Sequence, residues 1–287
     1  GGPGSAPHRA CTPKYAYHTT LIFYFNFDVH ADAASRQFVQ RLTAAAKPLE
    51  RCFRRVQFES AKLLPEEDKY PVGVSLMFYR LLLSRSFSRR FDYMFWMESD
   101  VQVLKPLWLD KVYEEAMFPA HFWIKGSMYR GDQWDGMPER HPMQWDVMQA
   151  YAYHINGVGV YRLGDADFSH FVRAAMKKFP AASATSFNPF DISIWKVLQE
   201  VVSPAVGEGQ APSTDNWNIF QRYGHCVLYT DFVWNLGGNV GAEVLARARR
   251  SPGVYLAHGG TGEFKSKAAA QLKEEETARK VKQKVGA

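Results

Sequence analysis

The sequence predicts an α/β fold whose sheet is mixed but mostly parallel and flanked by helices. Strand-like and helix-like apolar segments alternate through residues 17–120, an order typical of strands joined by crossover helices. Hydrophobic residues make up 46% and aromatic residues 15% of the 287. This composition can build a large core and excludes a mainly disordered chain.

In the first half, β-branched and aromatic runs predict strands, and apolar residues at helical spacing predict helices between them. Pro106 is expected in the first turn of the third helix, where a missing N–H costs nothing. The expected strands are residues 17–27, 54–60 and 93–99, and the expected helices are residues 31–49, 72–84 and 107–118.

The second half is less regular. Apolar residues recur at helical spacing in residues 165–179 and 190–202, and Asp165 and Asp191 are the expected helix caps. Residues 131–148 are rich in Trp, Asp and Pro without periodicity, which predicts a long surface loop of functional importance. Strands are expected at residues 121–129, 154–163, 225–234 and 254–258.

The predicted organisation is one domain with a short extension on each side. Residues 1–16 comprise GGPGS, which we interpret as a cloning remnant, and an N-terminal extension. The domain covers residues 17–265, with halves at 17–120 and 121–265, and residues 266–287 form a Lys/Glu-rich tail. No apolar run approaches the roughly 20 residues of a membrane span. With GGPGS interpreted as a remnant, removal of a natural targeting or membrane-anchor segment stays open.

The charge of +6 is concentrated at one end. Residues 265–287 hold seven Lys or Arg against three Glu, so the body is close to neutral and no nucleic-acid partner is expected. Cys11, Cys52 and Cys226 lack the spacing of a metal site. One disulfide with a free thiol and three buried thiols both fit this pattern.

The most informative stretch is FDYMFWMESDVQVLKP, residues 91–106. It brings Glu98 and Asp100 to the end of an apolar strand, and ligands of α/β sheets collect beyond such ends. Two carboxylates there suit Mn²⁺ or Mg²⁺ together with the oxygens of a diphosphate. The alternative is a pair of solvated acids at the end of a strand.

Three short motifs in order resemble the GT-A fold nucleotide-sugar glycosyltransferases. MESD resembles their DxD-type metal motif, with Glu98 in place of the first Asp; YHINGVGVYRL resembles the strand lining the donor and acceptor pocket; and YLAHGGTGEFK resembles the C-terminal segment that returns a His ligand. The resemblance covers about residues 17–265 and is nearest to eukaryotic secretory-pathway or cell-wall enzymes. It implies a Rossmann-like GT-A domain, with a nucleotide-binding half (17–120) and an acceptor half (121–265).

The resemblance also implies the site residues. Glu98, Asp100 and His258 are the expected ligands of Mn²⁺ or Mg²⁺, with Asp100 acting in catalysis through the metal. Asp191 is the expected base of an inverting enzyme, although helix capping alone explains an Asp there. The weaker base candidates are Asp135, Asp215 and Asp231, and acceptor platforms are expected at Trp134, Trp145, Trp195 and Trp217. The expected donor-binding residues are Phe25, Asn26, Tyr70, Glu98, Ser99, Asn156, Gly157, Gly260 and Lys265.

The leading hypothesis is a metal-dependent glycosyltransferase that uses a UDP- or GDP-sugar and a glycan or glycoprotein acceptor. It would be a type II membrane protein of the Golgi or endoplasmic-reticulum lumen; a cytoplasmic location stays open. A non-catalytic glycan- or nucleotide-binding relative is the alternative. A sugar-nucleotide pyrophosphorylase fits less well because FNFDVHADAAS, after the first strand, lacks the expected Gly- and Lys/Arg-rich loop. Retention and inversion both stay open.

Overall fold

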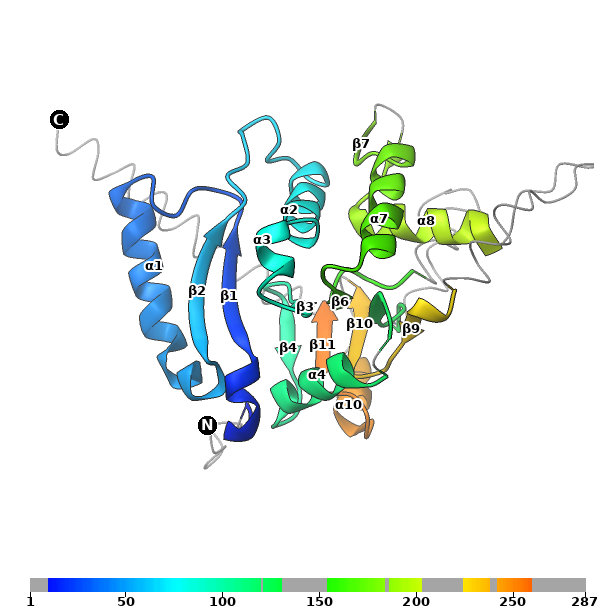
Figure 1. Cartoon of the computed structure of the whole chain (residues 1–287). Coiled ribbons are helices and arrows are strands. Elements are labelled where there is room, and N and C mark those ends of the chain that lie inside the picture. Colours follow the sequence, from blue (N-terminus) through cyan, green and yellow to red (C-terminus); the bar gives the residue numbers. More distant parts are fainter. Residues whose placement is uncertain are drawn as a thin grey trace, which may run out of the picture.

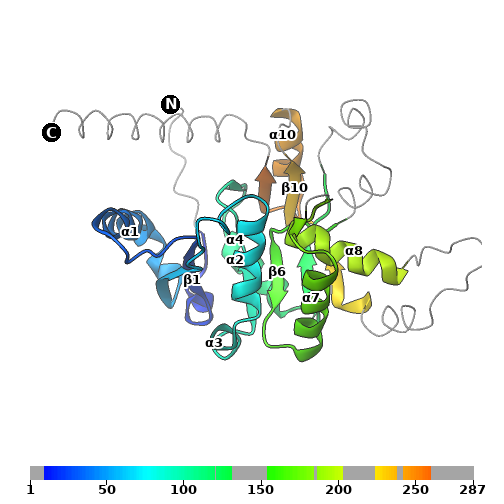
Figure 2. The same ribbon diagram turned by 90° about the horizontal axis from the view of Figure 1, so that it is seen from above.

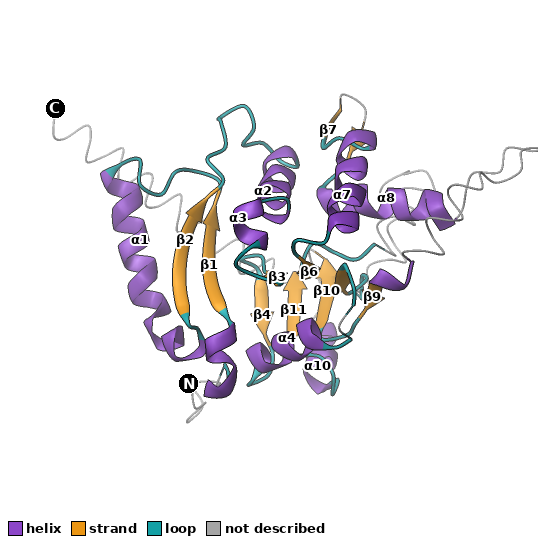
Figure 3. Ribbon diagram, viewed as in Figure 1, coloured by secondary structure: helices purple, strands orange, loops and turns teal. Residues whose placement is uncertain are grey.

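The structure is a computed structural model that describes residues 10–119, 121–130, 154–183, 186–202, 224–237 and 242–259. These residues form a mixed α/β fold in which helices surround several short sheets (Figures 1 and 3). The predicted loop at residues 131–148 and the tail lie outside the described residues.

The N-terminal unit is a parallel strand pair with a crossover helix. Strand β1 (Thr20–Phe25) pairs in register with β2 (Arg55–Ser60), and helix α1 (Ala33–Ala46) connects them. Asp32 caps α1 by accepting from the Ser35 N–H, and the rings of Phe25 and Phe38 meet at 5.8 Å. Figure 1 shows α1 along the outer side of this strand pair. Short 3₁₀ helices precede the strands: η1 (Pro13–His18) and η2 (Lys47–Cys52).

A disulfide fastens this unit to the rest of the chain. Cys11 and Cys52 are bonded, whereas Cys226 is a buried free thiol. The segment beside Cys11 is hydrogen-bonded to helix α4 (Trp108–Met117): Leu109 N–H donates to the Ala10 carbonyl. Of the two cysteine arrangements that the sequence allowed, the structure therefore contains the single disulfide.

Two larger sheets lie in the centre of the fold. One has the order β3 (Tyr93–Trp96), β6 (Gly159–Arg162), β5 (Ile124–Gly126) and β9 (Val227–Tyr229). The other has the order β10 (Val233–Gly237), β11 (Leu256–Gly259) and β4 (Val101–Val103). A small pair, β7 (Ala182–Ser183) and β8 (Ser186–Phe187), lies apart from them in the strand order.

The prediction of a mostly parallel sheet is wrong. Among the described strands, only β1–β2, β10–β11 and β5–β9 are parallel, whereas β6 runs antiparallel to both β3 and β5 and β4 runs antiparallel to β11. The direction of each strand depends on the distant strand that it pairs with, and β6 and β4 both pair antiparallel. After β3 the chain makes a turn in which Val101 N–H donates to the Glu98 carbonyl. This turn leads into β4, a strand that was not expected from the sequence, before the chain reaches α4.

The main core lies between β3, β6, β5 and the helices α2 (Val72–Leu82), α7 (Ala166–Lys178) and α8 (Phe190–Val202). Phe78 of α2 stacks on Phe190 of α8 with ring centres 3.8 Å apart, and Tyr161 of β6 meets the Phe78 ring edge-on. Figure 2 shows α2, β6, α7 and α8 grouped together. The other helices of the described ranges are α3 (Arg85–Ser88), α10 (Ala242–Arg250) and η4 (Gly224–Cys226).

Helix boundaries differ from expectation in two places. Pro106 lies outside α4, whose N-cap is Leu107 at a φ of 59°. Helix α8 begins at Phe190, so Asp191 lies inside the first turn and is not the N-cap. The Asp165 cap is confirmed by its bond from the Phe168 N–H. Within the described ranges, no helix combines the length and the apolar character that crossing a membrane requires.

Candidate metal and donor site

Two distant parts of the chain meet beside the turn that follows β3. Glu98 and Asp100 lie in that turn, immediately before β4. Strand β11 pairs with β4 so that His258 is opposite Val101. The antiparallel register therefore brings His258 alongside the two acids.

The three side chains form a close cluster. His258 Nε2 is 3.2 Å from Asp100 Oδ1 and 3.3 Å from Glu98 Oε2. One ligand atom from each residue lies within 4.8 Å of the others. The side chains of Asp100 and His258 are 9% and 12% exposed, whereas that of Glu98 is 37% exposed. The cluster is thus open to solvent on the Glu98 side and closed behind Asp100.

The acids control the protonation of His258. Burial alone would lower the pKa of this imidazole, but its hydrogen bonds with Asp100 and Glu98 and their negative charge raise the pKa to about 9. The imidazole is therefore a cation at neutral pH in this arrangement. It partly neutralises two carboxylates that would otherwise repel each other.

The donor set fits a divalent cation. Two carboxylate oxygens and one imidazole nitrogen converge, and carboxylates suit Mg²⁺ and Mn²⁺. Mn²⁺ fits this set better than Mg²⁺, because Mg²⁺ in proteins is usually held by carboxylates, phosphates and water. A metal would have to replace the proton on Nε2.

Gly157 makes room for Glu98. A Cβ atom at this position would lie 2.9 Å from Phe190 Cζ and 3.1 Å from Glu98 Oε1. Both distances are shorter than ordinary contacts, so a larger residue would displace the ring or the carboxylate. The neighbouring Asn156 accepts from the Val158 N–H through Oδ1. The predicted Asn-Gly pair therefore lies beside the acidic cluster.

Asp191 is tied to the same loop. Its Oδ2 accepts from the Gly157 N–H at 3.0 Å and lies 3.4 Å from His154 Nε2, and its Oδ1 accepts from the Ile192 N–H. Burial would raise the pKa of this carboxyl, but the contacts with His154, Ile192 and Gly157 outweigh burial and lower it. Asp191 is thus a buried anion with three donors around it.

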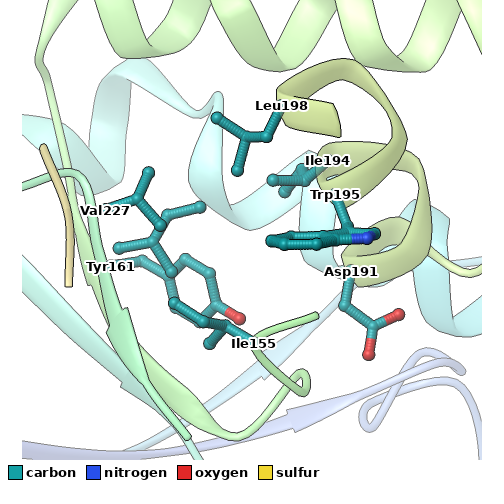
Figure 4. A pocket seen from close by; sticks show the side chains of 8 residues that line it. Ile155, Tyr161, Asp191, Ile194, Trp195, Leu198 and Val227 are labelled. Carbon is teal, nitrogen blue, oxygen red and sulfur yellow. The ribbon is translucent and has the colours of Figure 1, made fainter. Parts of the chain in front are cut away.

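The small cavity beside Asp191 is too small for a sugar. It offers about 10 Å³ to a water-sized molecule, at the lower limit for a single water. Figure 4 shows apolar side chains around it, among them Ile155, Leu198 and Val227, with the Asp191 carboxylate directed away from them. Trp195, an expected acceptor platform, lines this cavity.

The residues predicted to bind the donor are only partly gathered together. Phe25 packs on α1, and Asn26 donates to Asp68 Oδ2 at 2.7 Å. Tyr70 is 72% exposed, and Ser99 is exposed in the turn between the two acids. Asp231 is exposed and paired with Arg130. Gly260, Lys265, Asp135, Asp215, Trp134, Trp145 and Trp217 lie outside the described residues.

Two residues of this region were missed from the sequence. His154 contacts Asp191, and Asn235 of β10 contacts the His258 ring. Both belong to strand-like segments in which a single polar residue gives no signal by itself.

Comparison of the chain with protein-family models, with curated proteins and with solved structures finds no match to any of them.

Proposed function

We propose that the chain is a metal-dependent glycosyltransferase of the GT-A type, which moves a sugar from a UDP- or GDP-sugar to a hydroxyl of a glycan or glycoprotein. The observation that carries the proposal is the convergence of Glu98, Asp100 and His258. The first two come from the motif that resembles DxD, and the third comes from the segment that resembles the C-terminal His motif. A bound Mn²⁺ or Mg²⁺ would supply Lewis-acid stabilisation of the charge on the departing diphosphate.

The chain's own residues have separate roles in this proposal. Asp100 and His258 form the buried side of the metal site, and the more exposed Glu98 faces the donor. Gly157 lacks the side chain that would press on Phe190 and Glu98, so it allows Glu98 to keep its place in the cluster. Asn26 follows β1 directly and is the residue expected to contact the nucleotide, and its amide donates to Asp68 Oδ2.

The disulfide supports the proposed location. A disulfide such as Cys11–Cys52 persists mainly in oxidising compartments. This fits the lumen of the Golgi or the endoplasmic reticulum, where the secretory-pathway glycosyltransferases that the sequence resembles are found.

A non-catalytic nucleotide- or glycan-binding protein is the second candidate. The observation that favours it concerns Asp191, the expected base, because its carboxylate is buried and already accepts from Gly157 and Ile192. A carboxylate with a lowered pKa is a weaker proton acceptor.

The two candidates differ in turnover. A panel of UDP- and GDP-sugars should be screened with Mn²⁺, with Mg²⁺ and with EDTA, first by thermal shift and then by release of the nucleoside diphosphate. We expect metal-dependent binding and turnover for at least one donor. Asp100→Asn should abolish both, whereas Asp92→Asn, an exposed acid at the other end of β3, should change neither. Metal-dependent binding without turnover across glycan and glycoprotein acceptors would support the second candidate. Absence of binding to any nucleotide sugar would overturn the transferase and would leave a glycan-binding protein as the candidate.

A further inference from the structure

Asn235 lies directly opposite His258 in the parallel pair of β10 and β11. Its side-chain Oδ1 is 3.3 Å from His258 Nδ1. The two ring nitrogens therefore face different partners, because Nε2 faces Glu98 and Asp100. The imidazole is held between an amide on one side and two carboxylates on the other.

The position of Asn235 is itself fixed from its other edge. Its backbone N–H donates to Ser127 Oγ at 3.2 Å, and its carbonyl accepts from the Arg130 N–H at 2.7 Å. Asn235 is 5% exposed and Ser127 is 2% exposed. A buried amide that is anchored through its backbone has little freedom to move away from the ring.

The contact between Asn235 Oδ1 and His258 Nδ1 affects which ring nitrogen carries the proton. A neutral imidazole carries one N–H, and the other nitrogen is then an acceptor or a metal ligand. Once the proton on Nε2 has been removed for metal binding, the amide oxygen of Asn235 accepts from Nδ1–H and holds the remaining proton there, which leaves the lone pair on Nε2. Nitrogen Nε2 is the atom that faces the acids. The contact therefore selects the tautomer that can bind a metal.

We infer that Asn235 positions His258 as a metal ligand, by holding Nδ1–H so that Nε2 points at the site formed with Glu98 and Asp100. The inference rests on the metal site of the proposed function. Metal-bound histidines usually donate their second N–H to a neighbouring acceptor, and loss of that acceptor typically weakens metal binding about 10- to 100-fold. Asn235 is a positioning residue because it acts through His258.

The test measures the affinity of the whole chain for Mn²⁺ alone, from the electron paramagnetic resonance signal of the free ion. We expect Asn235→Ala to weaken Mn²⁺ binding about 10- to 100-fold and Asn235→Asp to restore it, because a carboxylate also accepts from Nδ1–H. Asn235→Leu has nearly the same size without an acceptor and should resemble Asn235→Ala. It replaces the alanine variant if that variant does not fold.

A matched control removes an amide from the strand on the other side of β11. Gln102 of β4 donates to the Gly259 carbonyl, so Gln102→Ala should leave Mn²⁺ affinity within about twofold. If Asn235 has a purely structural role, Asn235→Ala should lower the melting temperature without metal, and Asn235→Asp should lower it equally. Neither variant should then weaken Mn²⁺ binding beyond what the loss of stability explains.

A double-mutant cycle with His258→Ala tests the route of the effect. If Asn235 acts through His258, Asn235→Ala has no further effect on Mn²⁺ affinity in the His258→Ala background. An equal loss in both backgrounds overturns the inference, and so does unchanged affinity of Asn235→Ala in the otherwise unaltered chain. Both of these results leave the proposed function intact. Failure of the unaltered chain to bind Mn²⁺ or Mg²⁺ overturns the metal site and, with it, the proposed function.

Discussion

Asp100 Oδ1 and His258 Nε2 lie 3.2 Å apart across the antiparallel pair of β4 and β11. Glu98 Oε2 completes the contact at 3.3 Å. In this arrangement a proton on Nε2 balances part of the charge of the two acids. A divalent cation would take the place of that proton, so protonation and metal binding compete for the same three side chains.

The first prediction concerns stability and pH without metal. The pKa of His258 is raised from 6.5 to about 9 in the folded protein, so folding favours the protonated imidazole. This contribution is fully present below about pH 6.5 and is lost as the pH rises through about 9. At roughly 1.4 kcal/mol per pKa unit, the free energy of unfolding should fall by about 3 kcal/mol over that window. Urea denaturation in EDTA at several pH values measures it.

The control for this prediction removes the titrating group. His258→Asn should be less stable than the unaltered chain at pH 6.5 and should lose the pH dependence between about 6.5 and 9. If its stability falls with pH as steeply as that of the unaltered chain, another group is responsible.

The second prediction concerns the space beside Glu98. Gly157→Ala would place Cβ 2.9 Å from Phe190 Cζ and 3.1 Å from Glu98 Oε1. Overpacking of this kind typically costs about 1–3 kcal/mol, and displacement of Glu98 should also weaken Mn²⁺ binding. Gly253→Ala is the matched control, because nothing lies within 4 Å of a Cβ there. Equal melting temperatures and equal Mn²⁺ affinities for the two variants would contradict the prediction.

The sequence was most informative where one strong local pattern was sufficient. The run around Phe78, the Asp165 cap and the β1–α1–β2 order each follow from periodicity or capping, and the structure confirms them. Sheet direction did not follow, because it depends on which distant strands pair. The turn from Glu98 to Val101 was identified only as a pair of acids, and the short strand β4 that follows it spans three residues, too few to show a period.

The residues of the candidate site likewise differ in how far the sequence could identify them. The acids Glu98 and Asp100 are close in sequence, so a motif could identify them. Asn235 and His154 could not be identified, because each depends on a contact made only in the folded chain. Burial of a single Asn or His leaves no periodic mark on the sequence.

The third prediction concerns the disulfide. Cys11 and Cys52 are separated by 41 residues, and cross-linking a loop of this size lowers the entropy of the unfolded chain, which corresponds to about 4 kcal/mol. The Cys11→Ala/Cys52→Ala variant should lose roughly that amount of unfolding free energy in urea. The control is Cys226→Ala, which keeps the disulfide. Adding a strong reductant to the urea titration should lower the unfolding free energy of this variant as it does for the unaltered chain. A double variant as stable as the unaltered chain would show that the disulfide does not stabilise the fold.

The fourth prediction concerns Asp191. Asp191→Ala leaves the Gly157 and Ile192 N–H groups and His154 without their shared partner, and we expect a loss of about 3 kcal/mol in unfolding free energy. Asp191→Asn keeps one acceptor oxygen but brings its NH₂ group to a donor, so its loss should be smaller, at about 1–2 kcal/mol. Asp165→Ala, which removes the N-cap of α7, should cost about 1 kcal/mol.

The same Asn variant separates the two roles of Asp191. If Asp191 is the catalytic base, Asp191→Asn should lose turnover and keep its affinity for the donor, because an amide cannot take the proton from the hydroxyl of the acceptor. If the Asp191 carboxylate only holds Gly157 in place, Asp191→Asn should keep turnover. Its affinity for the donor or for Mn²⁺ should fall, because Gly157 shifts beside Glu98. Single-turnover rates and donor titrations on Asp191→Asn therefore assign the residue. The three donors around its carboxylate make positioning of the Gly157 loop the role that the geometry favours.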